Sequence, residues 1–122
     1  MNEERDQAAG NREIAVAREI IDRSLYMVVA TADQSGQPWS SPVYFAPSGY
    51  RDFFWVSEPD ATHSLNLRDR REVGIVIFDS SVPIGKGQGV YVLGVARELP
   101  AHETAEAHFV LDEHDHRVEV RL

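Results

Sequence analysis

The sequence contains no cysteine, and this absence excludes several kinds of chemistry together. The chain can form no disulfide, no thiolate metal site and no cysteine-based catalytic centre. It also lacks any apolar run approaching the about 20 residues that a membrane-spanning helix needs. The N-terminal stretch MNEERDQAAGNREIA has no apolar segment behind its charges, which indicates a loose tail over residues 1–10 and not a secretory signal. We therefore expect a soluble, cytoplasmic protein with no membrane partner.

Lysine is almost absent as well. Lys86 is the one lysine, and the rest of the 12 Lys and Arg residues are arginines. The net charge of -8 makes nucleic acid an unfavourable partner, since that binding depends on Lys and Arg neutralising phosphates. Three arginines, Arg68, Arg70 and Arg71, nevertheless follow His63 closely. They could attract a small anion or pair with surface acids, and the sequence leaves both interpretations open.

The 122 residues are enough for one domain, residues 1–122, with a single core. Past a predicted N-cap at Asn11, apolar residues at spacings of three and four indicate a helix that ends near Leu25. β-Branched and aromatic segments between short turns predict strands over residues 26–33, 38–46, 52–58, 72–79 and 89–100, with a sixth over 108–112 or 117–122. Asp60 is the expected N-cap of a short helix over 61–69 that turns Leu65 and Leu67 toward the core. This pattern is typical of a mainly β barrel or sandwich.

Four details of these segments carry expectations of their own. Segment 26–33 is so continuously apolar that we expect it to be buried on both faces. Pro42 has no N–H for a ladder, so it marks a sheet edge or a bulge. Gly94 interrupts the long fifth strand where a barrel strand would bend. Residues 101–107, AHETAEA, predict a helical turn.

Three other motifs fit no established site. PIGKGQG matches neither glycine-rich phosphate pattern, because a strand and not a helix follows Gly89. The acidic and histidine residues near the C-terminus, including HDH at 114–116, fit no metal-site spacing, so we predict no metal. A Ser-His-Asp set can be drawn from Ser40 or Ser41, His63 and Asp60, but no GxSxG nucleophile turn is present.

The first turn of the predicted short helix is the strongest candidate site. It carries His63 and Ser64, and Ser57 ends the preceding strand. Free N–H groups and the positive end of the helix dipole favour an anion such as phosphate at such a turn. The alternative, which the residues leave open, is that Ser57 and Ser64 are local capping hydroxyls.

Three segments, in order along the chain, resemble the pyridoxamine 5'-phosphate oxidase-like family of FMN-binding split β-barrels. They are MVVATADQSGQPWSSPVYF, FFWVSEPDATHSLNLRDRREVGIVIFD and GQGVYVLGVAREL, within Tyr26 to Leu99. The resemblance implies an antiparallel split β-barrel of about six strands, with an N-terminal helix and a short helix between strands three and four. It also implies an FMN-dependent oxidoreductase that acts on a small organic molecule.

The resemblance further implies which residues contact the cofactor. His63 and Ser64 would meet the FMN phosphate, although many members carry Lys or Arg where this chain has His63. PWSSPVYF would run beside the isoalloxazine ring and the ribityl chain, and FWVS would contribute the end of the next strand. These two strands supply Ser40, Ser41, Pro42, Val43, Trp55, Val56 and Ser57. Gln88 falls where relatives place a polar residue that reaches the flavin from the other subunit, which implies a homodimer with its cofactor sites at the interface.

The substrate and the catalytic residues stay open at this point. Flavin itself supplies redox chemistry, so we name no catalytic acid or base, and core packing is the simpler interpretation of the potential proton donors Tyr44 and Tyr91. Only PAHETAEA separates AREL from HFVLDEHDHRVEVRL, where similar proteins have a longer region. Alternatives on the same fold are a deazaflavin-dependent reductase, a non-catalytic flavin-binding or sensor protein, and an inactive interaction module. True pyridoxamine phosphate oxidation is the least favoured activity, because only Arg117 and Arg121 near the C-terminus could bind that substrate.

Overall fold

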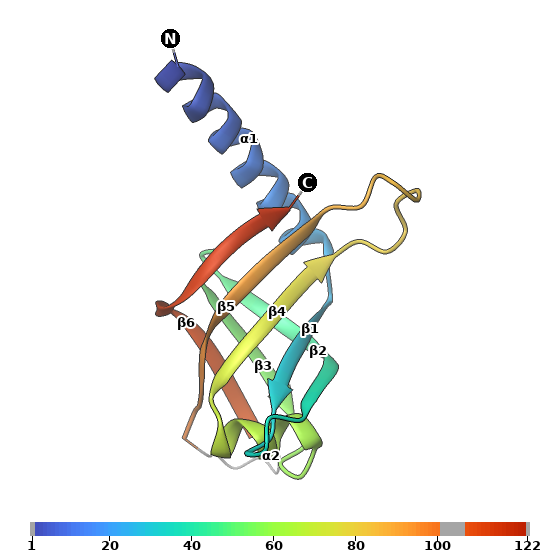
Figure 1. The fold of residues 1–122 in the computed structure, drawn as a ribbon, viewed down its shortest axis with the longest axis vertical. Coiled ribbons are helices and arrows are strands. Elements are labelled where there is room, and N and C mark those ends of the chain that lie inside the picture. The colour runs from blue at the N-terminus through green and yellow to red at the C-terminus, as the bar shows by residue number, and fades with distance from the viewer. Residues whose placement is uncertain (1, 101–106, 122) are drawn as a thin grey trace.

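The computed structural model describes residues 2–100 and 107–121, with the outer ends of the first helix and the last strand described by their backbone alone. Within these residues the elements are α1 (Asn2–Arg23), β1 (Tyr26–Ala32), β2 (Pro38–Ser48), β3 (Asp52–Ser57), α2 (Thr62–Asp69), β4 (Glu72–Phe78), β5 (Gly89–Glu98) and β6 (Ala107–Arg121). The strands pair antiparallel and close into a barrel in the order β1-β2-β3-β6-β5-β4 (Figure 1). The expected mainly β, antiparallel split barrel with one helix before it and one between β3 and β4 is confirmed.

Strand β2 changes partners along its length. Its residues 38–44 pair with β1, and its residues 45–48 pair with β3. Pro42, opposite Val28, therefore lies where the described ladders bond β2 on one side only. A proline is tolerated at such a position because it has no N–H to donate. The expectation that Pro42 marks an edge is confirmed.

Strands β5 and β6 pair with one irregularity. The register shifts between Gly94 and Ala96, which is the bend expected at the glycine. β6 pairs with β3 through residues 107–111 and then follows β5 to Arg121, so the two segments considered for the sixth strand belong to one strand. Of the expected helical turn at 101–107, residues 101–106 lie outside the described residues and Ala107 begins β6.

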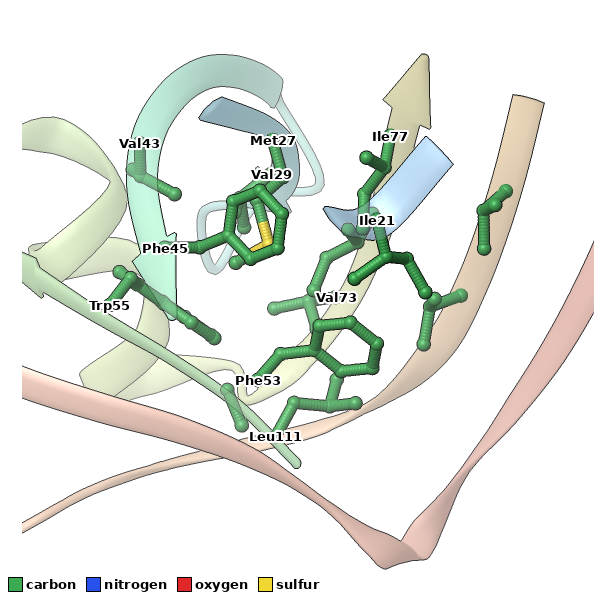
Figure 2. Packing of buried hydrophobic residues seen from close by; sticks show 14 of the residues in the cluster. Ile21, Met27, Val29, Val43, Phe45, Phe53, Trp55, Val73, Ile77 and Leu111 are labelled. Atoms are coloured by element: carbon green, nitrogen blue, oxygen red, sulfur yellow. The ribbon is translucent and has the colours of Figure 1, made fainter. Parts of the chain in front are cut away.

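Alternate residues of the strands fill the barrel interior. In β1 the buried Met27 and Val29 alternate with Tyr26, Val28 and Ala30, which are more exposed. The expectation that this strand is buried on both faces is therefore wrong, and the reason is that its outward residues are apolar too. Figure 2 shows the interior side chains gathered inside the barrel, among them Val43, Phe45, Phe53, Trp55, Val73, Ile77 and Leu111.

Helix α1 begins at Asn2, well before the predicted N-cap at Asn11, so residues 2–10 continue the helix where a loose tail was expected. Glu, Arg, Gln and Ala favour helix, and acidic residues near a helix start interact favourably with its dipole. The second half of α1 buries Ala17, Ile20 and Ile21 against the barrel, while the first half extends away from it (Figure 1). Across the residues that the structure describes, no helix is both long and apolar enough to cross a membrane.

Helix α2 differs from its prediction in two respects. Its N-cap is Ala61 and not Asp60, and no side chain caps it. Leu67 is buried as expected, but Leu65 is 48% exposed. The expectations for Asp60 and Leu65 are therefore wrong. The physical reason for Leu65 is that α2 covers a polar end of the barrel, so polar Ser64 and Asn66 are buried beside Leu67 on the inner face of this helix.

Candidate functional site

One end of the barrel interior is polar. The inward rows of β1, β2 and β3 continue from apolar residues to Thr31, Ser41 and Ser57, and all three are buried. α2 packs across this end of the barrel (Figure 1). Buried hydroxyl groups require hydrogen-bond partners, and residues of α2 supply them.

His63, in the first turn of α2, bridges two of these hydroxyls. Its Nδ1 lies 3.1 Å from Ser41 Oγ, and its Nε2 lies 2.7 Å from Ser57 Oγ. Burial lowers the pKa of His63 below its usual value of 6.5, because desolvation disfavours the charged ring. At neutral pH the ring is therefore neutral, with one nitrogen donating to a hydroxyl and the other accepting from one.

Two further side chains of α2 are bonded to the barrel. Asn66 Nδ2 donates to Thr31 Oγ1 at 3.1 Å, and Ser64 Oγ donates to the carbonyl oxygen of Glu58 at 2.7 Å. Asn66 and Thr31 were not among the site residues predicted from the sequence. Thr31 could have been found, since it continues the period-two inward row that begins with Met27 and Val29.

Ser41, Ser57 and His63, which we call the α2 cluster, are thus brought together from three elements. The serine that accepts from the ring N–H keeps its own O–H free to donate to an anion, as do the backbone N–H groups that open a helix. The helix dipole supplies partial positive charge, and a bound phosphate would favour the protonated form of His63. These residues therefore fit a phosphate group, with His63 as the member of the cluster whose charge can change.

The arginines that follow α2's first turn are directed elsewhere. Arg68 donates to the carbonyl oxygen of Pro59 at 2.9 Å and forms an ion pair with Glu98 at 3.3 Å. The Arg70 guanidinium lies 3.4 Å from the carbonyl oxygen of Gln34. Surface pairing is therefore the observed role of Arg68, and such exposed ion pairs contribute little to stability.

The other predicted contacts divide between the two sides of the barrel wall. Ser40, Pro42 and Val56 are exposed on the outer side of β2 and β3. Val43 and Trp55 are interior residues, 5% and 2% exposed, so their side chains are not readily met by an outer ligand. Val43 is also paired with Met27 of β1, and Trp55 with strands on both sides. The Ser64 hydroxyl is likewise buried and bonded to Glu58, which leaves its backbone N–H as the group that could face an anion.

Gln88 lies at the other end of the barrel from α2. It precedes β5 in the loop that joins β4 to β5, and this loop projects from the end opposite α2 (Figure 1). Gln88 is exposed beside α1, where Ile20, Arg23 and Lys86 line the same small cleft. Within one chain, therefore, Gln88 and the α2 cluster do not belong to one site.

Two alternative chemistries find no support in the described geometry. Both ring nitrogens of His63 face serine hydroxyls, so Asp60 does not orient this histidine as a catalytic triad would require. Among the described side chains no group of three or more His, Asp or Glu residues could hold a metal ion. The side chains of Asp112 to His116, where HDH was considered, lie outside that description.

Solved structures share the fold at low sequence identity. HutZ, a heme storage protein from Vibrio cholerae, is 16% identical with a TM-score of 0.68, covering 78% of this chain and 85% of that chain. HupZ from Group A Streptococcus is 19% identical with a TM-score of 0.66, covering 82% of this chain and 86% of that one. An F420 reductase is 16% identical with a TM-score of 0.68, covering 84% and 95% respectively. These similarities show the fold alone.

Sequence comparison is decisive for the family. A search of curated proteins gives no match. The family model described as pyridoxamine 5'-phosphate oxidase matches residues 15–118, which span α1's packed half, α2, strands β1 to β5 and most of β6. The chain therefore belongs to the pyridoxamine 5'-phosphate oxidase family.

Proposed function

We propose that this protein is an FMN-binding oxidoreductase that acts on a small organic substrate, with the FMN phosphate at the α2 cluster. The observation that carries the proposal is the convergence of Ser41, Ser57 and His63 at the opening turn of α2. Hydroxyl groups and helix N–H groups donate to phosphate oxygens without a permanent positive charge. Bound flavin would supply the hydride or electron chemistry, and the protein would supply position and electrostatics.

The rest of the cofactor would extend along the outer side of β2. The side chains of Ser40 and Pro42 are exposed there. Over residues 38–44, the described ladders also leave the edge of β2 that faces away from β1 without a β3 partner. The main-chain groups of Ser40 and the carbonyl oxygen of Pro42 face away from β1, because Phe45, an odd number of residues along, turns its N–H toward Leu25. They could hydrogen-bond to the ribityl chain or the ring, and exposed Val56 could contact the ring. The Ser64 backbone N–H would complete the phosphate contacts.

We further propose that the active protein is a homodimer. Gln88 can approach the flavin only from a second copy, because it lies at the end of the barrel opposite α2. The outer faces of β1, β4 and β5 expose apolar residues, namely Tyr26, Phe78, Tyr91, Leu93 and Val95. Two chains of net charge -8 repel one another, so they approach with the lowest electrostatic cost when uncharged faces meet. The single-domain organisation and the cytoplasmic location stay predictions.

The test is a titration of purified, ligand-free protein with FMN and riboflavin, combined with sedimentation to measure the mass. FMN binding that weakens by about 1–3 kcal/mol when the phosphate is missing would support the proposal. Because similar folds include an F420 reductase and heme proteins, F420 and heme belong in the same titration. Tight binding of F420 would favour the deazaflavin reductase, tight binding of heme a heme protein, and binding of none of the four the inactive interaction module.

A further inference from the structure

The outer face of β1 and its neighbouring strands carries a row of aromatic rings at the end away from α2. Tyr26 of β1 lies opposite Tyr44 of β2, and the two rings meet edge to face with their centroids 6.0 Å apart. Phe78 of β4 continues the row, because the register that pairs Val28 with Val76 also brings Tyr26 and Phe78 level. The three side chains, which we call the aromatic row, are between 48% and 62% exposed.

The same face is hollowed at its other end, beside α2. Ala30 of β1 pairs with Gly74 of β4, and Gly74 pairs in turn with Leu93 of β5. A Cβ atom added to Gly74 would lie 3.8 Å from the Cβ of Ala30 and 3.7 Å from the Cδ2 of Leu93, so the missing side chain belongs to this outer face. These residues line an open hollow of about 600 Å³, which we call the Gly74 hollow. Ala30 follows Tyr26 by four residues, which is about 13 Å along a strand.

Two copies of the chain can pack these faces together with their two-fold axis along the strands or across them. In a two-fold dimer, each contact between two different residues occurs twice. With the axis along the strands, the two hollows meet each other, which leaves their lining atoms without packing partners. With the axis across the strands, near Val28 and Val76, each aromatic row enters the hollow of the other copy. We propose that a second copy of this chain binds to this face in this second orientation, which we call crossed, with its Tyr26 and Phe78 rings in the Gly74 hollow.

The charged residues at the two ends of the face fit the crossed orientation. Arg70 and Glu72 line the hollow, and Arg23 and Asp79 line the surface beside the aromatic row. Crossing brings the first pair of one copy to the second pair of the other, so that each arginine can lie beside a carboxylate. The two chains, each of net charge -8, therefore meet at places where opposite charges can pair.

The crossed orientation gives the second copy a part in the proposed cofactor site. Ser40 pairs with Ala30 and Tyr44 pairs with Tyr26, so the same crossing sets the second copy's Tyr44 over Ser40, where the flavin is proposed to extend. The barrel end that carries Gln88 also meets the α2-covered end of the second copy, as the proposed role of Gln88 requires. The inference rests on the proposed homodimer, and the role of Tyr44 rests on the proposed flavin site as well.

The experiment exchanges large and small residues between two versions of the full chain without flavin. Ala30→Leu fills the hollow and Tyr26→Ala shortens the aromatic row, so each variant alone should dimerise at least about tenfold more weakly than wild type. In an equal mixture, the crossed orientation sets the filled hollow of one chain against the shortened residue of the other, and the second contact is that of the wild type. The mixture should therefore form heterodimers at close to wild-type affinity, as measured by sedimentation and by native mass spectrometry.

Further variants keep the test independent of any one substitution. Gly74→Leu with Phe78→Ala is the equivalent exchange on β4 if a variant of the first pair does not fold. Ala46→Leu, at an exposed position that pairs with Phe54 of β3, is the matched control and should leave dimerisation unchanged.

A dimer that both single variants leave intact, or a mixture that dimerises no better than either variant alone, would overturn the crossed orientation and leave the homodimer standing. A monomeric wild type would overturn both. Flavin binding is measured separately by the FMN titration, so the cofactor proposal and the crossed orientation can fail independently.

Discussion

Replacing His63 with alanine removes both hydrogen bonds that join α2 to the ends of β2 and β3. Each is a neutral hydrogen bond worth about 0.5–1.5 kcal/mol, so ligand-free protein should lose about 1–3 kcal/mol of unfolding free energy. An unfolding entropy of about 2.1 cal/mol/K per residue over 122 residues gives roughly 0.26 kcal/mol/K, so Tm should fall by about 4–12 °C.

The same substitution should separate FMN from riboflavin. If His63 holds the phosphate, the loss of a charge-assisted hydrogen bond of about 1.5–3 kcal/mol should weaken FMN binding roughly 10- to 150-fold and leave riboflavin binding nearly unchanged. Fluorescence titration measures both affinities. Thr31→Val, which removes the bond from Asn66, is the matched control that should lower Tm without changing the ratio of the two affinities. Equal weakening for both flavins would refute the assignment.

Four further predictions follow from the structure. Because the pKa of His63 is lowered in the folded protein, the unfolded chain binds a proton at this ring more tightly than the folded protein does. The free energy of unfolding should therefore fall as the pH drops from about 6.5 toward that lowered pKa. Urea unfolding midpoints that shift in parallel for wild type and His63→Ala would contradict this. The preference for FMN over riboflavin should rise as the pH falls from about 8 to 6.5, since phosphate favours the protonated ring, and a flat ratio would place the phosphate elsewhere. Gln88→Ala should weaken flavin binding while sedimentation still shows a dimer, and unaltered affinity would remove Gln88 from the site. Trp55→Ala should cost about 3–5 kcal/mol in a denaturant titration, whereas Val56→Ala should cost below about 1 kcal/mol, and similar costs would contradict their interior and exterior placement.

The positions of β1 to β5 could be predicted from the sequence because these strands are rich in β-branched or aromatic residues and bounded by turn residues. The extent of β6 could not, because it joins two segments that the sequence offered as alternatives. The faces of β1 were not readable, because Tyr26 and Val28 are as apolar as the core residues between them. The start of α1 was missed for a different reason. Gly10 and Asn11 resemble a helix boundary, yet the helix formers on both sides outweigh the local cost of a glycine.

The candidate site could be predicted only partly from the sequence. Motif resemblance singled out Ser41, Ser57 and His63, and the structure brings these three side chains together. It could not show that the hydroxyl of Ser64 bonds to Glu58 or that Trp55 turns inward, because both depend on which side of a helix or strand meets the barrel. Tertiary packing, and not local propensity, sets that rotation.

The one-sided stretch of β2 has a consequence for folding in a crowded solution. A strand edge with unpaired N–H and C=O groups can recruit a strand from another molecule and start an aggregate. Pro38 and Pro42 lie within this stretch, and each removes one donor from the edge. Prolines there would allow β2 to leave its outer side open for a ligand without offering a continuous ladder to a neighbouring chain.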